Sequence, residues 1–440
     1  MAGETIETDY LIVGCGAVGM AFADVVLSET EADIVIVDRH HMPGGHWNDA
    51  YSFVTLHQPS AFYGVSSMEL SSGRKDEVGL NKGLHELASG AEVSAYFDKA
   101  MRQRFLPSGR VRYFPSCDYI GDWSRTGRFR SLLTGKETEV TVRAKTVDGT
   151  YFNTTVPSTH TPNFEIEPGA TLRPLNDLPK LTERPDGFTV VGGGKTAIDA
   201  VLWLLERVEP DMIRWIKPRD GWLINRANTQ PTEEFFANTI GAQAAQMEAA
   251  AAATDVDDLF RRLEEAKVLL RIYPDVKPSM YHGATISEAE VDALRAVTNV
   301  VRLGRVTRLG LHEIELERGS ILTTPGTFHV DCSARAVPGA EIVPVFTEDR
   351  ITVQTVRTIQ PVFSAAFIAH VEVAYETVKE KNRLCQVVPI PNHDTDWMRV
   401  TAALMMNQMA WSKDDGIRAW LEANRLDGFT AMVRAVDEWD

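Results

Sequence analysis

The sequence predicts an α/β fold with two Rossmann-like dinucleotide-binding domains and a helical insertion. Three observations lead to this prediction. A glycine-rich turn joins a buried strand to a helix at residues 14–19, a second such turn follows at 192–197, and an alanine-rich helical segment lies beyond both. A chain of 440 residues is also too long for one ordinary core and suggests two or three domains.

The first strand–turn–helix–strand unit lies close to the start of the chain. Strands of buried type are expected over 10–13 and 33–37, with a helix over 18–28 between them. The turn has the pattern G-x-G-x-x-G, formed by Gly14, Gly16 and Gly19. In this pattern the first glycine permits the tight turn, the second lets the backbone approach a pyrophosphate, and the third lets the helix pack on the strand. Asp38 ends the second strand, where a carboxylate accepts hydrogen bonds from a ribose diol. The alternative interpretation is a glycine turn that binds no ligand.

The second unit repeats this arrangement with a different end. A strand is expected over 188–191, a helix over 195–206 that begins with Lys195 and Thr196, and a strand over 212–216. The turn has the pattern G-x-G-x-x-A, formed by Gly192, Gly194 and Ala197.

No acid follows the second strand of this unit. Arg214, Lys217 and Arg219 surround the corresponding position instead. A cation attracts the 2′-phosphate of NADPH, which an acid would repel. The pattern therefore favours NADPH over NADH, and the alternative is that these three side chains are solvated surface cations.

Two dinucleotide folds in one chain indicate electron transfer between two dinucleotides, with FAD in the first and the nicotinamide cofactor in the second. Disulfide reductases share this plan but require a redox-active cysteine pair. The four cysteines, Cys15, Cys117, Cys332 and Cys385, are scattered and form no C-x-x-C pair. This pattern excludes the disulfide-reductase class and is typical of a reduced, cytoplasmic protein.

The composition of the chain indicates which classes of binding partner to expect. The formal net charge of −16 argues against nucleic acid, because an acidic surface repels phosphate backbones. No apolar run approaches the roughly 20 residues that span a bilayer, and the polar opening residues do not form a signal peptide, so we expect no membrane partner. His40 and His41 have no third ligand at metal spacing, and no metal is expected. An oligomer is possible.

The remaining elements suggest where the domains divide. Helices are expected over 84–104, 235–265, 287–297, 365–381 and 411–424, and strands within 111–142 and 300–330. A proline-rich connection at 155–185 marks a boundary. We expect an FAD-binding domain at 1–155 and 320–440, an NADPH-binding domain at 156–234 and 300–319, and a helical insertion at 235–299.

Four motifs give the chain a resemblance to a known family. They are the Gly14 turn, the run Pro43-Gly44-Gly45-His46-Trp47, the second glycine turn with its Lys195, and the run Arg219-Asp220-Gly221-Trp222. In this combination the chain resembles the class B flavoprotein monooxygenases, which include flavin-containing, Baeyer–Villiger and N-hydroxylating monooxygenases. It departs from them in two places. The F-x-G-x-x-x-H-x-x-x-W/Y fingerprint is not found near His160, and Asp331-Cys332-Ser333-Ala334 replaces a late Ala-Thr-Gly.

The resemblance implies further site residues. At the first site it adds Arg39, Gly45, His46, Trp47, Asp331 and Gln360 as candidates for contact with FAD, and at the second it adds Arg219 and Trp222 for NADPH. His57 and Gln58 lie in the stretch that passes the flavin ring in the resembling proteins. Either could donate a hydrogen bond that stabilises a flavin peroxide. The alternatives are a structural histidine at His57 and ordinary core burial for Trp47.

The function expected from these observations is an FAD- and NADPH-dependent monooxygenase that oxygenates a small organic molecule with O2 through a flavin peroxide. One alternative is an NADPH-dependent flavoprotein reductase or dehydrogenase that inserts no oxygen. A second is a non-catalytic nucleotide-binding protein. The sequence does not specify the substrate.

Overall fold

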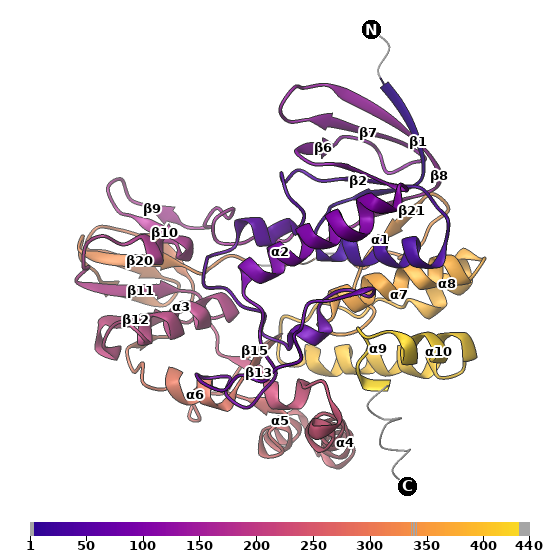
Figure 1. Ribbon diagram of the computed structural model, residues 1–440. Helices are drawn as coiled ribbons and strands as arrows, with labels where there is room; N and C mark the ends of the chain where they lie inside the picture. Colours follow the sequence, from indigo (N-terminus) through magenta and orange to yellow (C-terminus); the bar gives the residue numbers. More distant parts are fainter. Residues whose placement is uncertain (1–3, 336, 338, 340, 431–440) are drawn as a thin grey trace.

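The computed structural model describes residues 4–335, 337, 339 and 341–430. The fold is mixed α/β and contains two parallel-sheet units joined by a smaller, mainly helical part (Figure 1). The first sheet lies at the top of Figure 1, the second lies at its left, and helices α4 and α5 lie below both. The predicted fold class is therefore confirmed.

The first sheet contains five parallel strands, β5, β2, β1, β8 and β21, and an antiparallel extension formed by β7 and β6. Its strand order is β5-β2-β1-β8-β7-β6, and β21 also pairs with β8. The bounds are β1 Glu4–Val13, β2 Ile34–Val37, β5 Val111–Phe114, β6 Cys117–Tyr119, β7 Thr126–Ser131, β8 Glu137–Asp148 and β21 Arg350–Thr352. All four residues of β2 are buried, as expected for a strand covered on both faces.

Helices from both ends of the chain cover this sheet. Helix α1 (Ala17–Glu29) packs along α7 (Pro361–Ala374), which belongs to the last part of the chain. Helix α2 (Gly90–Ala100) starts later than the expected 84–104 helix, because a capping box of Ser89 and Glu92 fixes its first turn. The short strands β3 (Gly64–Val65) and β4 (Met68–Glu69) precede it.

The second sheet is parallel throughout, in the order β10-β20-β11-β12-β16. The bounds are β10 Leu172–Pro174, β11 Gly187–Val191, β12 Ile213–Ile216, β16 Val300–Val301 and β20 Thr327–Asp331. Successive residues of β11 point to opposite faces. Val190 packs in a cluster with helices α3 (Lys195–Leu205) and α6 (Glu288–Leu294), and Val191 packs in another cluster with a four-stranded sheet. That sheet consists of β9 Glu165–Ile166, β17 Val306–Leu309, β18 Glu313–Leu316 and β19 Gly319–Leu322.

Strand pairing places the internal boundaries differently from the expected ones. Strand β20 lies within the range 320–440 that was expected in the first domain, yet it pairs with β11 and β10 of the second sheet. Helix α6 lies within the expected insertion but packs on α3. Both differences have the same cause. The second unit includes a strand, β20, and a helix, α6, that lie far along the chain from the β11 and α3 they contact.

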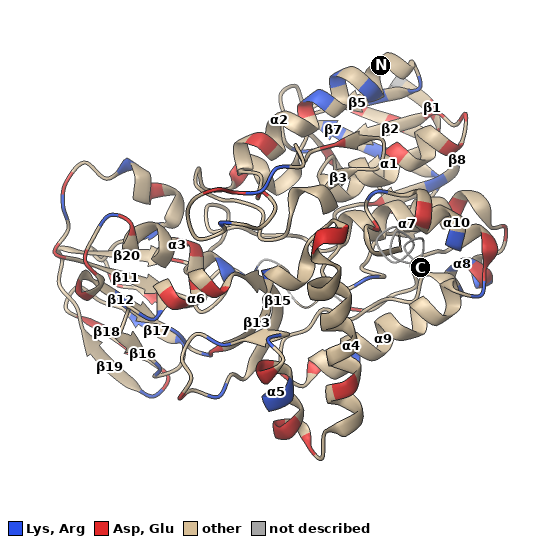
Figure 2. Ribbon diagram, turned by 60° about the horizontal axis from the view of Figure 1, so that its bottom comes forward, with Lys and Arg blue, Asp and Glu red and all other residues tan. Residues whose placement is uncertain are grey.

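The insertion has its own sheet and core. The sheet has three strands, β13 Gly221–Asn225, β14 Leu269–Leu270 and β15 Met280–Ile286. The helices of the insertion are α4 Phe236–Ala252 and α5 Val256–Glu265. The later helices are α8 Val378–Leu384, α9 Asp396–Trp411 and α10 Asp415–Ala423. Figure 2 shows α9 lying beside α4, and Trp397 of α9 packs in the core of the insertion.

Candidate dinucleotide sites and the cavity between them

The first glycine turn is required by the fold itself. Gly14 has φ +99°, and a Cβ at Gly19 would lie 1.9 Å from the Gly14 carbonyl oxygen. A Cβ at Gly16 would meet nothing closer than the Gly45 Cα at 3.5 Å, an ordinary contact. Two residues that the sequence did not single out, Gly149 and Thr150 after β8, close the other side of the turn.

Asp38 lies at the predicted position and is held on both carboxylate oxygens. Its Oδ2 accepts the backbone N–H of Cys15 at 2.5 Å, and its Oδ1 contacts Nδ1 of His40 at 3.0 Å. The other ring nitrogen of His40 contacts Oδ2 of Asp49 at 2.8 Å. The hydrogen bond to Asp38 is the main cause that raises the pKa of His40 to about 9. Arg39 points outward and pairs with Asp118 at 3.1 Å.

Both glycine turns leave the following helix end free for an anion. Helices α1 and α3 begin after Gly16 and Gly194, and neither has a side-chain cap or an acidic residue in its first turn. The first N–H groups of a helix have no partner within it and carry partial positive charge. The two ends can therefore accept a pyrophosphate each.

The second turn combines tight packing with one open position. Gly192 has φ +142°, and a Cβ there would lie 2.2 Å from the carbonyl oxygen of Cys332. Trp215 donates its indole N–H to the Gly192 carbonyl at 2.7 Å. A Cβ at Gly194 would have no atom within 4 Å, so this glycine faces open space. The open space at Gly194 leaves room for a second dinucleotide to approach the backbone.

The residues that start α3 are both at this turn. Lys195 forms an ion pair with Asp199 one helical turn later, and Thr196 is half-buried. The ammonium group of Lys195 is therefore already paired with a carboxylate.

The three cations expected around a 2′-phosphate do not lie together. Arg214 sits early in β12 and donates to the carbonyl of Leu322, on β19. Lys217 is buried and pairs with Asp220 at 2.7 Å. Arg214 is therefore bonded away from the turn, whereas the Lys217 side chain lies at it, with its Cγ 3.9 Å from the position of a Cβ at Gly193 and its charge paired with Asp220.

Arg219 lies at the same turn as Lys217. Its carbonyl oxygen would lie 2.7 Å from a Cβ at Gly193, and its guanidinium donates to the carbonyl and side chain of Asn392 at 3.2 and 2.9 Å. Desolvation, followed by the positive charges of Arg305 and Arg335, lowers its pKa. Arg305 and Arg335 are therefore close enough to the Arg219 guanidinium to act on its charge.

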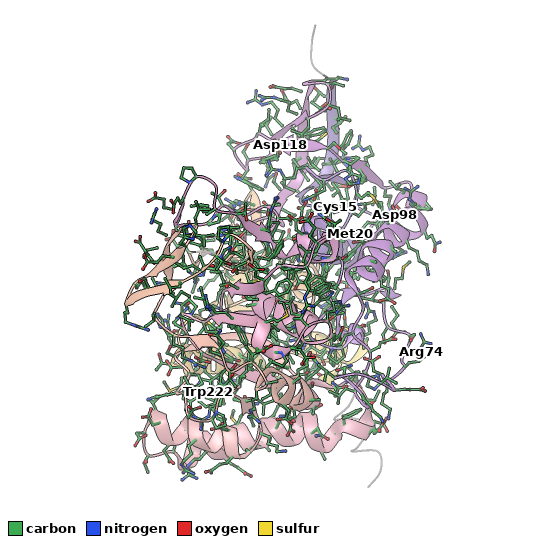
Figure 3. All side chains as sticks on the ribbon, turned by 90° about the vertical axis from the view of Figure 1, so that its left-hand side faces the viewer. Cys15, Met20, Arg74, Asp98, Asp118 and Trp222 are labelled. Carbon is green, nitrogen blue, oxygen red and sulfur yellow. The ribbon has the colours of Figure 1, made fainter. Side chains whose placement is uncertain are left out.

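Two expected cofactor contacts fall elsewhere. Trp222 is buried in the insertion core, with its ring stacked on Phe260 at 5.3 Å, and Figure 3 shows it far from Cys15 of the first turn. Asp331 ends β20 in the second sheet and accepts from Ser333 at 2.6 Å, so it lies beside the second glycine turn rather than the first. Sequence spacing could not show which sheet this strand joins.

The segment after Trp47 joins the two units. Trp47 donates to the Tyr63 hydroxyl at 2.8 Å and stacks on His46, whose pKa burial lowers to about 4. Further along, the Tyr51 hydroxyl donates to Asp199 of α3 at 2.6 Å. The loop that follows the Gly45 turn therefore contacts the helix of the second turn.

His57 is held by the insertion. Its Nδ1 accepts the backbone N–H of Thr285 at 3.1 Å, and Arg226 donates to its carbonyl at 3.0 Å. Burial, together with the charges of Lys195 and Arg226, lowers its pKa to about 3. Arg226 is fully buried and pairs with Glu290 at 2.7 Å, and no sequence pattern indicates this ion pair.

Gln58 and Gln360 border one cavity. Both line a space of about 320 Å³ between α4, α9 and the residues before α7. Gln360 caps α7 without a side-chain hydrogen bond, and the preceding Ile359 has φ +60°, a strained conformation for a β-branched residue. Such strain is often found at functional sites.

Across the described residues, no group of three or more His, Cys, Asp or Glu side chains could hold a metal ion. Within that same part of the chain, no helix is both long and apolar enough to cross a membrane.

Comparison with solved structures defines the class of fold. Cyclohexanone monooxygenase from Rhodococcus sp. Phi1 bound to NADP+ superposes with a TM-score of 0.52 at 10% identity, over 84% of each chain. Cyclohexanone-bound cyclohexanone monooxygenase in the Rotated conformation gives 0.51 at 10% identity, over 99% of this chain and 98% of that one. The fold is that of two-domain, Rossmann-like flavoprotein monooxygenase structures.

The sequence relatives define the family. No family model matches the chain. The uncharacterized proteins Rv2000 of Mycobacterium tuberculosis and Mb2023 of Mycobacterium bovis are each 48% identical over 425 residues, which cover 96% of this chain and 78% of each relative. The chain belongs to the family of these mycobacterial proteins.

Proposed function

We propose that this protein is an FAD- and NADPH-dependent oxidoreductase, and specifically a monooxygenase that acts on a small organic molecule. The observation that carries the proposal is the pair of uncapped helix ends at Gly16 and Gly194, each at the carboxyl edge of its own parallel sheet. A loop contact, Tyr51 to Asp199, ties the two sites together. Two dinucleotide sites joined in this way suit electron transfer from one dinucleotide to the other.

The residues present fit FAD at the first site. Gly16 leaves room for the backbone to approach a pyrophosphate, and the N-terminus of α1 supplies free N–H groups. Asp38 would accept from the ribose, and the uncapped start of α7 at Gln360 would face the ring system. FAD supplies the redox chemistry when bound, and the protein orients it and keeps water away.

NADPH would occupy the second site. Gly194 opens toward it, the start of α3 would hold the pyrophosphate, and Arg219 would contact the 2′-phosphate. The NADP+-bound cyclohexanone monooxygenase has a similar fold and supports this placement.

Oxygen insertion is the finer part of the proposal. His57 lies against the insertion at Thr285, and the next residue, Gln58, lines the cavity, where a substrate could be enclosed. Donors at such a position stabilise developing negative charge on oxygen. The second candidate is a reductase without oxygen insertion, favoured by the lack of the F-x-G-x-x-x-H-x-x-x-W/Y run near His160.

One experiment separates these two candidates. Turnover with NADPH under 18O2, across amines, thioethers and ketones, is followed by mass spectrometry of the product and by assay of released hydrogen peroxide. The monooxygenase predicts one 18O atom in the product per NADPH consumed. Stoichiometric peroxide with no labelled product from any substrate would establish the reductase instead.

A further inference from the structure

The Arg219 guanidinium is held by a residue from the last part of the chain. Its Nη1 donates to the backbone carbonyl of Asn392 at 3.2 Å, and its Nη2 donates to the side-chain Oδ1 of the same residue at 2.9 Å. Asn392 follows Arg219 by 173 positions and lies just before α9. One residue that belongs to no glycine motif therefore orients the guanidinium beside the second glycine turn.

Both acceptors on Asn392 are neutral. A backbone carbonyl or an amide oxygen orients a guanidinium without cancelling its charge, whereas a carboxylate also neutralises it. Lys217, at the same turn, shows the second case, because Asp220 pairs with its ammonium group at 2.7 Å. Among the residues that the structure describes, no carboxylate forms an ion pair with Arg219, and the charges that act on its pKa are those of Arg305 and Arg335. The positive charge of Arg219 is therefore not neutralised.

Arg219 also remains accessible at this position. Arg219 and Asn392 are both half-buried, whereas the Lys217 side chain is only 2% exposed. The backbone of Arg219 borders the turn, since its carbonyl oxygen would lie 2.7 Å from a Cβ at Gly193. Of the two cationic side chains at this turn, Arg219 is thus the one that combines an exposed surface with an unpaired charge.

Hydrogen bonds fix the amide of Asn392 in its orientation. Nε2 of His282, on β15, lies 3.1 Å from the Oδ1 that Arg219 also contacts, and the amide Nδ2 lies 3.2 Å from Nε2 of His393. The backbone is fixed as well, because Oδ2 of Asp396 accepts the N–H groups of Asn392 and His393, both at 2.9 Å. The amide oxygen is therefore directed toward Arg219 by contacts on every side of the residue.

Three parts of the molecule meet at Asn392. Figures 1 and 2 both show β15 between the second sheet and α9. Met280 of β15 forms an isolated β-bridge with His393, which joins the segment before α9 to the insertion. Asp396 is the first residue of α9. The orientation of Arg219 at the second turn thus depends on the insertion and on the last part of the chain together.

We propose that Asn392 is a positioning residue for nucleotide selection, which holds the Arg219 guanidinium through neutral acceptors and so leaves its charge available to the 2′-phosphate of NADPH. This inference rests on the proposed function, because it concerns a phosphate of the cofactor placed at the second site. An aspartate at position 392 would offer Arg219 similar acceptors but would neutralise it, as Asp220 neutralises Lys217. Selection for the 2′-phosphate therefore requires the amide and not only an acceptor at this place.

Calorimetric titration of the full-length purified protein tests the proposal. The probes are adenosine 2′,5′-bisphosphate and adenosine 5′-monophosphate, which differ only in the 2′-phosphate. The wild type should prefer the bisphosphate about ten- to a hundredfold, as one charge-assisted phosphate contact provides. Asn392→Asp should reduce this preference about tenfold, because the new carboxylate neutralises Arg219. Asn392→Ala should reduce it about threefold, because the backbone carbonyl still holds one edge of the guanidinium.

A double variant separates positioning of Arg219 from direct repulsion or general damage. In the Arg219→Ala background, Asn392→Ala should leave both affinities unchanged, because the group that it positions is gone. Asn238→Asp makes the same change of charge at an exposed position of α4 and should behave as the wild type. Melting temperatures serve as the folding control, and Asn392→Asp, which keeps the size of the side chain, remains a test if Asn392→Ala does not fold.

Three results would overturn the proposal. They are a wild type without preference for the bisphosphate, an unchanged preference in Asn392→Asp, and a loss of affinity in Asn392→Ala that is equal for both nucleotides or persists in the Arg219→Ala background.

The binding measurement does not depend on redox activity. If the bisphosphate preference depends on Asn392 in a protein whose flavin NADPH does not reduce, the proposed function is refuted and the role of Asn392 stands. If NADPH reduces the flavin and the preference does not depend on Asn392, the oxidoreductase stands and the role of Asn392 is refuted.

Discussion

Thr285 donates its backbone N–H to Nδ1 of His57 across 3.1 Å. A neutral imidazole with an accepting Nδ1 must carry its proton on Nε2. Since the pKa of His57 is lowered to about 3, the ring stays neutral throughout the physiological range. The insertion therefore fixes His57 as a donor through Nε2.

This tautomer leads to a prediction on coupling. His57→Ala or Gln58→Ala should raise the fraction of NADPH oxidised that ends as hydrogen peroxide, because one donor to developing negative charge is lost, at a cost of about 2.7–4 kcal/mol. The measurement is peroxide released per NADPH at saturating substrate. Titration of His57 should not change the wild-type ratio of peroxide to NADPH between pH 5 and 8, because the pKa of His57 is about 3. Unchanged coupling in both variants would remove these residues from the chemistry.

His40 gives a prediction on stability against pH. Its folded pKa of about 9 lies above the ordinary value of 6.5, so its stabilisation is complete below pH 6.5 and is lost as the pH rises through about 9. The full shift would correspond to about 3 kcal/mol, and solvent screening of this partly exposed pair reduces that figure. Urea unfolding at pH 6 and 9.5 should show this loss in the wild type and much less of it in His40→Gln. The exposed neighbour His41→Gln is the control, and an identical pH dependence in all three proteins would refute the assignment.

The glycine positions separate folding from ligand binding. Gly19→Ala should not yield folded protein, because its Cβ would overlap the Gly14 carbonyl. Gly16→Ala and Gly194→Ala should fold normally, since both glycines have extended backbone and room for a methyl group. The first should lose bound FAD, and the second should keep FAD while its KM for NADPH rises.

Flavin content per chain and steady-state kinetics check these outcomes, with melting temperature as the folding control. A folded Gly16→Ala protein with full flavin occupancy would mean that the first turn does not hold the pyrophosphate.

Nucleotide preference should depend on Arg219 and not on Arg214. Arg219→Ala should raise the KM for NADPH about ten- to a hundredfold and leave NADH nearly unchanged, because a charge-assisted phosphate contact is worth about 1.5–3 kcal/mol. Arg214→Ala is the matched control, since that side chain donates to Leu322 instead. If the wild type prefers NADH, the 2′-phosphate site is absent.

The parts of the fold that the sequence predicts are the local ones. The glycine turns, α1, α3 and the strands beside them depend on residues within about 30 positions, and the structure has them where expected. The sheet that β20 joins depends on pairing with β11, far back in the chain, and no local pattern reports it. Asp331 was therefore expected at the wrong site.

The candidate site residues show the same division between features set by local sequence and features set by long-range contacts. Arg214, Lys217 and Arg219 are close in sequence, but their charged groups bind three different partners, namely the Leu322 carbonyl, Asp220 and Asn392. No sequence pattern indicates Arg226, because its partners Glu290 and the His57 carbonyl are brought to it only by the folded chain. A motif can locate a turn, but it cannot show which side chains face it.

The most direct test of the account is anaerobic mixing of the purified, flavin-bound protein with NADPH, followed by absorbance at the flavin band. We predict that the flavin bleaches fully with one equivalent of NADPH, that NADH acts far more slowly, and that Gly194→Ala slows the reaction with NADPH while its flavin content is unchanged. A purified protein that binds no FAD, or one whose bound FAD NADPH does not reduce, would contradict the claim that the two sites form one electron-transfer enzyme.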